Sequence, residues 1–203
     1  VKYLPVVGSH DATISIRSIT QQTIEVSGNP VKWLQGHNLF GTNDLKALIW
    51  AFFNELLKIP ELKLKPSLQQ LHAIKSGNLT ISRIDINETW FLNSREEVLA
   101  WLEAAGQKMR LKHRGDTLYW GKNSRRWSIK CYSKGDEINS KKSNFPDALR
   151  TPEMLAYADR ALRLELTLRS NQLREWLLHD VSHWGPDTGK MLLLGLIKGL
   201  EMS

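Results

Sequence analysis

The chain has 203 residues, of which 41% are apolar and 24% charged, proportions that are typical of a globular protein with a sizeable core. No segment approaches the ~20 consecutive apolar residues that span a bilayer, and the first residues lack the apolar stretch of a secretory signal. The single cysteine, Cys131, excludes an internal disulfide framework and a cysteine-only zinc site. We therefore expect a soluble protein of a reducing compartment.

The charge is concentrated in one stretch of the chain. The whole sequence has 28 Lys and Arg against 21 acidic residues, a net charge of +7. Residues 108–150 alone contain twelve Lys or Arg and four acidic residues, a local net charge of +8. Concentrated positive charge attracts polyanions, and phosphate contacts dominate the affinity of proteins for nucleic acids. A solvated cationic face without a partner is the alternative interpretation.

The first third of the chain predicts a hairpin followed by two helices. Residues 12–19 alternate apolar and polar side chains, and residues 23–27 repeat the pattern after a short polar turn. Apolar residues at three- and four-residue spacings predict a helix over 45–59, which Pro60 ends. A second helix is expected over 68–75, with Gly77 as its C-cap.

The rest of the chain predicts further strands and helices. Ser94 and Glu97 have the spacing of a capping box before an apolar stripe, and Thr151-Pro152 opens another helix. The segment after residue 171 is expected to be helical, with a break at Gly185-Pro186. Strands are predicted over residues 79–87, 110–113, 117–121, 127–134 and 162–168.

This order of elements predicts a single α+β domain over residues 1–203. We expect a mostly antiparallel central sheet with helices packed on one face, and a C-terminal helical segment over 171–203. No internal repeat or low-complexity linker divides the chain.

Strand periodicity places ionisable side chains on defined faces. In residues 162–168 the leucines share one face, so Glu165 projects from the other. In residues 127–134, Tyr132 shares its face with Lys130 and Lys134. In residues 79–87, Asp85 lies opposite the isoleucines and beside Arg83.

If these polar faces coincide, two carboxylates could hold Mg²⁺ or Mn²⁺ beside a phenol. Both cations prefer oxygen ligands and can polarise a phosphodiester. We expect the lysines beside Tyr132 to favour its phenolate. The alternatives are solvated carboxylates, ion pairs of Arg83 with Asp85 and of Arg163 with Glu165, and a tyrosine without chemistry.

The remaining metal- and phosphate-binding motifs give weaker evidence of function. His179 and His183 have the i, i+4 spacing of a helical zinc pair, but the glutamate of a metalloprotease signature is missing, and a surface pair is the alternative. The sequence has no His-x-His pair and no Gly-rich phosphate loop of the Walker kind.

At these same segments the sequence resembles the gene II family of replication initiators of filamentous phages. The most specific match is the block 32–45, KWLQGHNLFGTNDL. Residues 81–85 (ISRID), 119–125, 132–137 (YSKGDE) and 155–169, which ends in RLELTLR, follow in the family's order, so the resemblance covers roughly residues 12–180.

The resemblance implies a rolling-circle nickase fold and a metal-dependent endonuclease that cuts one strand at a phage or plasmid origin and rejoins it. Such an enzyme becomes attached to the 5′ phosphate through a tyrosine. By motif match Tyr132 is the nucleophile and Lys134 its partner. Metal ligation is assigned to Asp85, Glu165 and, less directly, Glu137, with Mg²⁺ or Mn²⁺ as cofactor. Expected DNA contacts are His37, Lys130, Arg125, Arg126, Arg83 and Arg163.

His37 in the specific block either binds DNA or holds the turn. The implied partners are origin DNA, single-stranded or supercoiled, and the host helicase and polymerase, in the cytoplasm of a bacterial host and without a membrane. Family members begin with a further hydrophobic strand and continue beyond the end of this chain, which is therefore expected to be trimmed at both ends.

Two other functions compete with this one. A non-catalytic DNA-binding replication modulator could use the same fold and the same basic surface. A protein that binds RNA or single strands could use Trp120 and Trp127 as stacking platforms.

Overall fold

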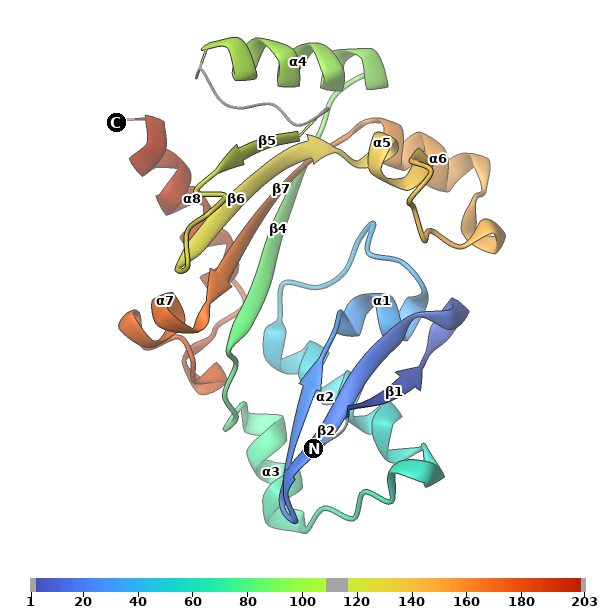
Figure 1. Cartoon of the computed structure of the whole chain (residues 1–203), viewed down its shortest axis with the longest axis vertical. Helices are drawn as coiled ribbons and strands as arrows, with labels where there is room; N and C mark the ends of the chain where they lie inside the picture. Colours follow the sequence, from blue (N-terminus) through green and yellow to red (C-terminus); the bar gives the residue numbers. More distant parts are fainter. Residues whose placement is uncertain (1–2, 109–116, 202–203) are drawn as a thin grey trace.

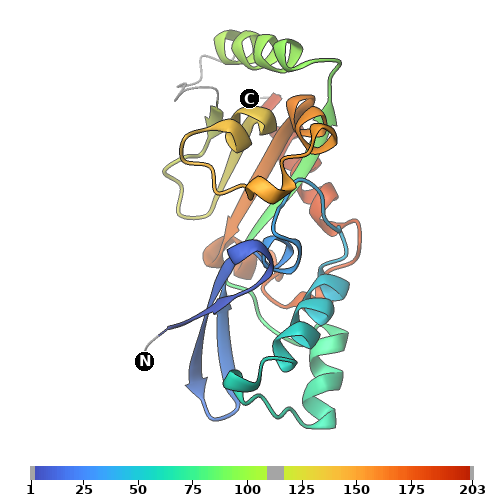
Figure 2. The same ribbon diagram turned by 90° about the vertical axis from the view of Figure 1, so that its right-hand side faces the viewer.

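The computed structural model describes residues 3–108 and 117–201, and it is an α+β fold built on two antiparallel sheets. The smaller sheet has the order β1-β2-β3 and the larger one the order β4-β7-β6-β5. The two sheets lie at opposite ends of an elongated molecule (Figures 1 and 2). The α+β class is confirmed, but the expectation of one central sheet is wrong, because alternation within a strand does not encode which strands pair.

The elements follow one another along the chain with these bounds. The strands are β1 (Leu4–Val7), β2 (Thr13–Thr20), β3 (Thr23–Ser27), β4 (Arg83–Phe91), β5 (Thr117–Trp120), β6 (Trp127–Ser133) and β7 (Ala161–Arg169). The α-helices are α1 (Pro30–Gln35), α2 (Leu45–Leu57), α3 (Leu68–Ser76), α4 (Arg95–Lys108), α5 (Lys134–Asn139), α6 (Pro152–Asp159), α7 (Ser170–Glu175) and α8 (Thr188–Glu201).

The smaller sheet contains the predicted hairpin and one strand that was not expected. β2 and β3 pair as predicted, and β1 adds to the free edge of β2. A strand therefore precedes the hairpin, in a segment for which the sequence predicted none. Pro5 lacks an N–H donor and is tolerated in a strand only at such an edge.

Helix α1 follows the hairpin, in a segment for which no element was predicted. The Asn29 side chain accepts a hydrogen bond from Lys32 N, Pro30 occupies the first turn, and Gly36 adopts φ 84° to end the helix. These are start and stop signals of a short helix. α1 delivers Trp33 to the core of the smaller sheet, where its ring contacts Phe52 of α2 edge-to-face at 5.2 Å.

The larger sheet carries the main core on its leucine face. The even-numbered leucines of β7 are at most 4% exposed, which confirms the predicted alternation. Helices α4, α7 and α8 cover this face, so the expected packing of helices on one face is confirmed for the larger sheet. The opposite face is polar.

Several strands and helices differ in detail from the elements predicted from the sequence. β4 begins at Arg83 because residues 79–81 pair instead with the segment around Asp180. At the start of α4, Ser94 Oγ accepts from Glu97 N, but the Glu97 carboxylate accepts from Asn93, so only half of the capping box forms. The strand predicted over 110–113 lies outside the described residues. Within the described part of the chain, no helix combines the length and apolar character needed to cross a membrane.

Candidate active site

The polar face of the larger sheet brings the predicted residues of three strands together. Tyr132 of β6 is directly opposite Arg163 of β7, and Lys130 is opposite Glu165. On the other side of β7, Asp85 of β4 is opposite Thr167. In an antiparallel pair, residues directly opposite one another project to the same face. Asp85, Tyr132 and Glu165 therefore share one face, as the predicted site requires.

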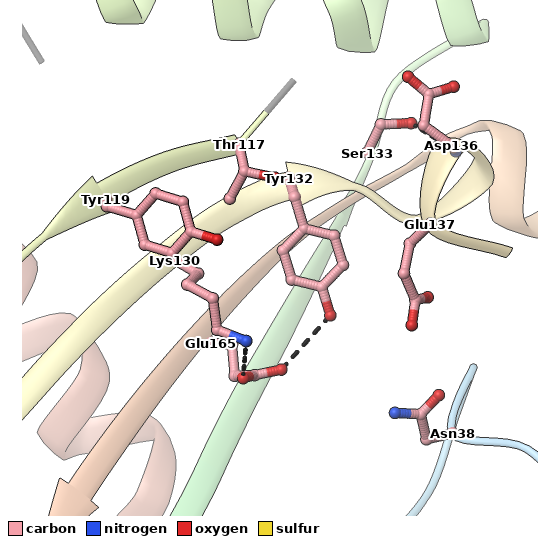
Figure 3. A pocket seen from close by; sticks show the side chains of 9 residues that line it. All are labelled: Asn38, Thr117, Tyr119, Lys130, Tyr132, Ser133, Asp136, Glu137 and Glu165. Atoms are coloured by element: carbon pink, nitrogen blue, oxygen red, sulfur yellow. Dashed lines mark hydrogen bonds and ion pairs between the residues drawn. The ribbon is translucent and has the colours of Figure 1, made fainter. Parts of the chain in front are cut away.

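A pocket of about 350 Å³ opens on this face around the Tyr132 hydroxyl (Figure 3). Strands β5, β6 and β7 form its floor, α5 one wall, and the loop between α1 and α2 another. Its lining residues are Asn38, Thr117, Tyr119, Lys130, Tyr132, Ser133, Asp136, Glu137 and Glu165.

Tyr132 is 9% exposed, and its hydroxyl donates to Glu165 Oε2 at 3.4 Å. Burial raises the pKa of Tyr132 above its ordinary value of 10.0, and the carboxylates of Glu165 and Glu137 raise it further. The expectation that nearby lysines favour the phenolate is therefore wrong. The phenol is protonated at neutral pH, so nucleophilic chemistry here requires a proton acceptor.

Each lysine near Tyr132 is paired with a carboxylate. Lys130 Nζ lies 2.5 Å from Glu165 Oε1, on the sheet face. Lys134 is completely buried, forms an ion pair with Glu137 and donates to Asn38 Oδ1 at 3.0 Å. Burial lowers the pKa of Lys134. The pocket thus holds two compensated ion pairs on either side of one phenol.

Lys134 was predicted to end the strand, but it begins helix α5. Ser133 caps this helix, with its side chain accepting from Asp136 N. The change of direction turns Glu137 back toward the pocket, where Figure 3 shows its carboxylate pointing to the same space as the Tyr132 hydroxyl. The sequence had placed Glu137 at the margin of the site.

The loop between α1 and α2 reaches the pocket because Arg163 holds it. Arg163 is 1% exposed and donates from Nη1 to Asn38 O at 2.9 Å and from Nη2 to Leu39 O at 2.5 Å. The expectation that Arg163 contacts DNA is therefore corrected. The guanidinium is enclosed, and both its terminal nitrogens donate to carbonyl oxygens of the loop.

His37 is also turned inward. It is 7% exposed, its Nδ1 accepts from Leu39 N at 3.3 Å, and its ring packs edge-to-face on Phe40 at 4.6 Å. Burial lowers the pKa of His37. Of the two roles left open for His37, the structure supports holding the turn and not contact with DNA.

Asp85 lies outside the pocket. Its carboxylate accepts from Thr167 Oγ1 at 2.7 Å and pairs with Arg83 at 3.2 Å. Among residues 3–108 and 117–201, no group of three or more His, Cys, Asp or Glu side chains is arranged to hold a metal ion. Asp85, Glu137 and Glu165 therefore do not form one cluster. The pocket's own oxygen donors, Glu137, Glu165 and Asn38, have the chemistry of a hard divalent cation site.

The remaining predicted DNA contacts lie on accessible parts of the surface. Arg125 and Arg126 are exposed on the turn between β5 and β6, where Arg126 forms an ion pair with Glu175. Arg83 is exposed beside Asp85, and Lys130 is half-buried. Contact of these four with DNA stays a prediction.

Other sequence motifs do not contribute to the pocket. His183 lies in a short 3₁₀ turn, and His179 precedes it in non-helical chain, so the helical zinc pair is not formed. Trp120 and Trp127 are half-buried and pack against the leucine core, away from the pocket lining. Asn38, Thr117 and Tyr119 line the site without having been predicted to do so. Asn38 and Tyr119 lie in segments that resemble the family, residues 32–45 and 119–125, whereas Thr117 had no signal.

The fold and the pocket together define a class of protein: an α+β domain whose antiparallel sheet presents a buried tyrosine to two lysine–glutamate pairs. Comparison of the sequence with known families identifies it further. Residues 2–187 match the N-terminal region of the phage replication-associated protein family, the gene II proteins, and the chain belongs to this family.

Two relatives illustrate the similarity. The replication-associated protein of this family from Enterobacteria phage I2-2 is 37% identical over an alignment that covers 100% of this chain and 62% of the relative. The protein of the same name from Enterobacteria phage M13 is 28% identical over 75% of this chain and 41% of the relative. The chain thus spans less than two thirds of the length of these relatives. No solved structure matches it significantly.

Proposed function

We propose that this chain is the catalytic domain of a phage or plasmid replication initiator that nicks one DNA strand through Tyr132 and later rejoins it. The observation that carries the proposal is the hydrogen bond from the Tyr132 hydroxyl to Glu165 inside the pocket. Membership of the phage replication-associated protein family supplies the link to DNA replication.

In this proposal Glu165 is the proton acceptor. As the Tyr132 oxygen attacks phosphorus, its proton passes to Glu165 Oε2, the P–O3′ bond breaks, and the 3′ oxygen leaves and takes up a proton from water. The products are a 5′-phosphotyrosine and a strand with a 3′ hydroxyl. Rejoining is the reverse attack by a 3′ hydroxyl, which regenerates the phenol.

The two ion pairs supply electrostatic stabilisation. Lys130 and Lys134 are held near the phenol ring, at 5.8 and 6.0 Å from its centroid, where negative charge develops on the phosphate during attack. Mg²⁺ or Mn²⁺ bound by Glu137, Glu165 and Asn38 would polarise the phosphodiester. Asn38 is fixed for this purpose by the Arg163 bonds to its loop.

The test is formation of a covalent adduct by the 203-residue chain on supercoiled or single-stranded DNA that carries its origin, with Mg²⁺ or Mn²⁺. Tyr132→Phe should abolish the adduct. DNA affinity should stay within about twofold, because the basic side chains that contact phosphates remain in the variant. Tyr3→Phe, which changes an exposed tyrosine hydrogen-bonded to Glu25 far from the pocket, should form the adduct like wild type.

The outcomes separate the competing functions. If wild type binds DNA but forms no adduct under these conditions, the proposal fails and a non-catalytic DNA-binding replication modulator is favoured. If Tyr132→Phe still forms the adduct, Tyr132 is not the nucleophile. Tyr119→Phe then tests the other tyrosine that lines the pocket.

A further inference from the structure

Three aromatic rings from separate parts of the chain meet beside the pocket. Phe40 of the loop between α1 and α2 lies 5.8 Å from Tyr157 of α6, and Tyr157 lies 4.9 Å from Phe91 at the end of β4. Both pairs are edge-to-face, so Tyr157 stands between the two phenylalanines. We call these three residues the aromatic cluster.

The two outer rings of the aromatic cluster are accessible. Phe40 is 49% exposed and Phe91 is 48% exposed, whereas Tyr157 is half-buried against a small core. Neighbouring exposed phenylalanines are unfavourable in water and commonly mark a binding surface. The cluster therefore offers apolar ring surface to a ligand.

The exposed ring of Phe40 is nevertheless held in place. Its neighbours in the loop, His37 and Leu39, are 7% and 1% exposed, and Arg163 binds the carbonyl oxygens of Asn38 and Leu39. Because the backbone on its N-terminal side is anchored, the ring is pre-positioned and loses little conformational entropy when it binds.

The aromatic cluster lies on the same sheet face as the pocket. Phe91 has the same parity in β4 as Asp85 and Thr89, and Thr89 is directly opposite Arg163, which is in turn opposite Tyr132. Phe91 thus lies two residues, or roughly 7 Å, beyond Thr89 along β4. On the other side, Phe40 follows Asn38, a lining residue of the pocket, by two positions.

The ligand that fits exposed ring surface on the same sheet face as a phosphodiester site is an unpaired base. Bases stack on aromatic side chains irrespective of sequence, and each stacked base contributes ~1–3 kcal/mol of binding free energy. Arg160 adds an exposed cation here, because its Nε donates to the carbonyl oxygen of Leu92, directly after Phe91, at 3.1 Å. It can meet the phosphate that accompanies the base.

We propose that the aromatic cluster is a stacking subsite for an unpaired base of the strand held at Tyr132. This inference rests on the proposed nicking function for the position of the strand. It predicts that Phe40 and Phe91 favour single-stranded over duplex DNA, since a paired base cannot present its ring to them.

The experiment measures the affinity of the 203-residue chain for a fluorescein-labelled oligodeoxynucleotide, single-stranded or annealed as a duplex. Phe40→Leu and Phe91→Leu keep the apolar contact but remove the aromatic ring. Each should weaken single-strand binding about 5- to 150-fold, the range that corresponds to one lost stack. Duplex affinity and the dependence on salt concentration should change little, because the phosphate contacts remain.

Matched variants show whether the loss is specific to stacking. Phe40→Tyr keeps an aromatic face and should bind like wild type. Trp101→Ala removes another exposed aromatic side chain, 37% exposed on α4, the helix that covers the leucine side of the sheet, and should also bind like wild type. Thermal melting checks that the leucine variants are folded.

Two results would overturn the inference. One is unchanged single-strand affinity of folded Phe40→Leu and Phe91→Leu. The other is a wild type that light scattering shows as a dimer and leucine variants that are monomers with unchanged DNA binding, which would make the aromatic cluster a contact between two copies. The adduct assay distinguishes the two proposals. If wild type forms the adduct but the leucine variants bind single strands like wild type, only the stacking subsite is refuted. Stacking without an adduct refutes only the nicking function.

Discussion

The two oxygens of Glu165 face different partners: Oε1 lies 2.5 Å from Lys130 Nζ, and Oε2 accepts the hydrogen bond from Tyr132 at 3.4 Å. The cross-strand register of β6 and β7 creates this arrangement, because Lys130 is directly opposite Glu165 and Tyr132 is two residues further along the same face. One carboxylate is therefore oriented by a lysine and presented to a phenol. This is the geometry of an oriented proton acceptor.

Glu165→Gln should slow adduct formation by about 100- to 10,000-fold, the usual range for the loss of a general base. The amide keeps the size of the side chain but cannot accept the Tyr132 proton. Single-turnover rates of adduct formation measure the effect, and DNA affinity should fall far less. Equal losses in rate and affinity would show that Glu165 serves only to bind DNA.

The pH dependence of stability should report the buried phenol. The pKa of Tyr132 is raised above 10.0 in the folded chain, so the folded state retains a proton that the unfolded state loses. The resulting stabilisation is complete below pH 10.0 and is lost as the pH rises from there toward the folded-state pKa.

Lys134 works in the opposite direction in the same range. Its folded-state pKa is lowered below 10.5, so the folded state binds fewer protons than the unfolded state and gains stability as pH rises. Urea unfolding of wild type and Tyr132→Phe isolates the phenol. Above pH 10.0 the free energy of unfolding of wild type should fall more steeply with pH than that of the variant. Parallel curves would contradict the burial of an ionisable hydroxyl.

The face of each strand was predictable because β7 has a clear apolar alternation. Leucines at every second position fixed which side of the sheet Glu165 occupies, and the same rule placed Lys130 and Tyr132 together. Convergence of these strands on one face required the pairing order, which local periodicity does not contain.

Other parts of the site had no periodic signal. Asn38 reaches the pocket from a loop that is 96 residues from Lys134 in sequence, and a buried arginine holds that loop. Lys134 continued the alternation of its strand, so the helix that turns Glu137 inward was not predicted. In the structure the Ser133 side chain caps this helix by accepting a hydrogen bond from Asp136 N. Interactions of this kind depend on tertiary packing and are not encoded in spacing.

Arg163→Gln should destabilise the chain and reduce nicking together. The variant loses charge-assisted hydrogen bonds to two loop carbonyl oxygens in a site that is 1% exposed, which corresponds to roughly 2–4 kcal/mol in the free energy of unfolding. The loop that carries Asn38 then loses its anchor. Arg125→Gln, on an exposed turn, is the control and should leave stability unchanged. Similar stability of the two variants would show that Arg163 does not hold the loop.

Metal titrations should distinguish the carboxylates of the pocket from Asp85. Both carboxylates are paired with a cation, Asp85 with Arg83 and Glu137 with Lys134, but only Glu137 lines the pocket. Glu137→Gln should therefore raise the Mn²⁺ concentration for half-maximal adduct formation by at least about 10-fold, while Asp85→Asn shifts it by less than about threefold. Calorimetric titration of the chain with Mn²⁺ alone provides a readout without turnover and should give the same ranking. If Asp85→Asn weakens Mn²⁺ binding as much as Glu137→Gln does, Asp85 is a ligand after all. The strand β4 must then move toward the pocket when metal binds.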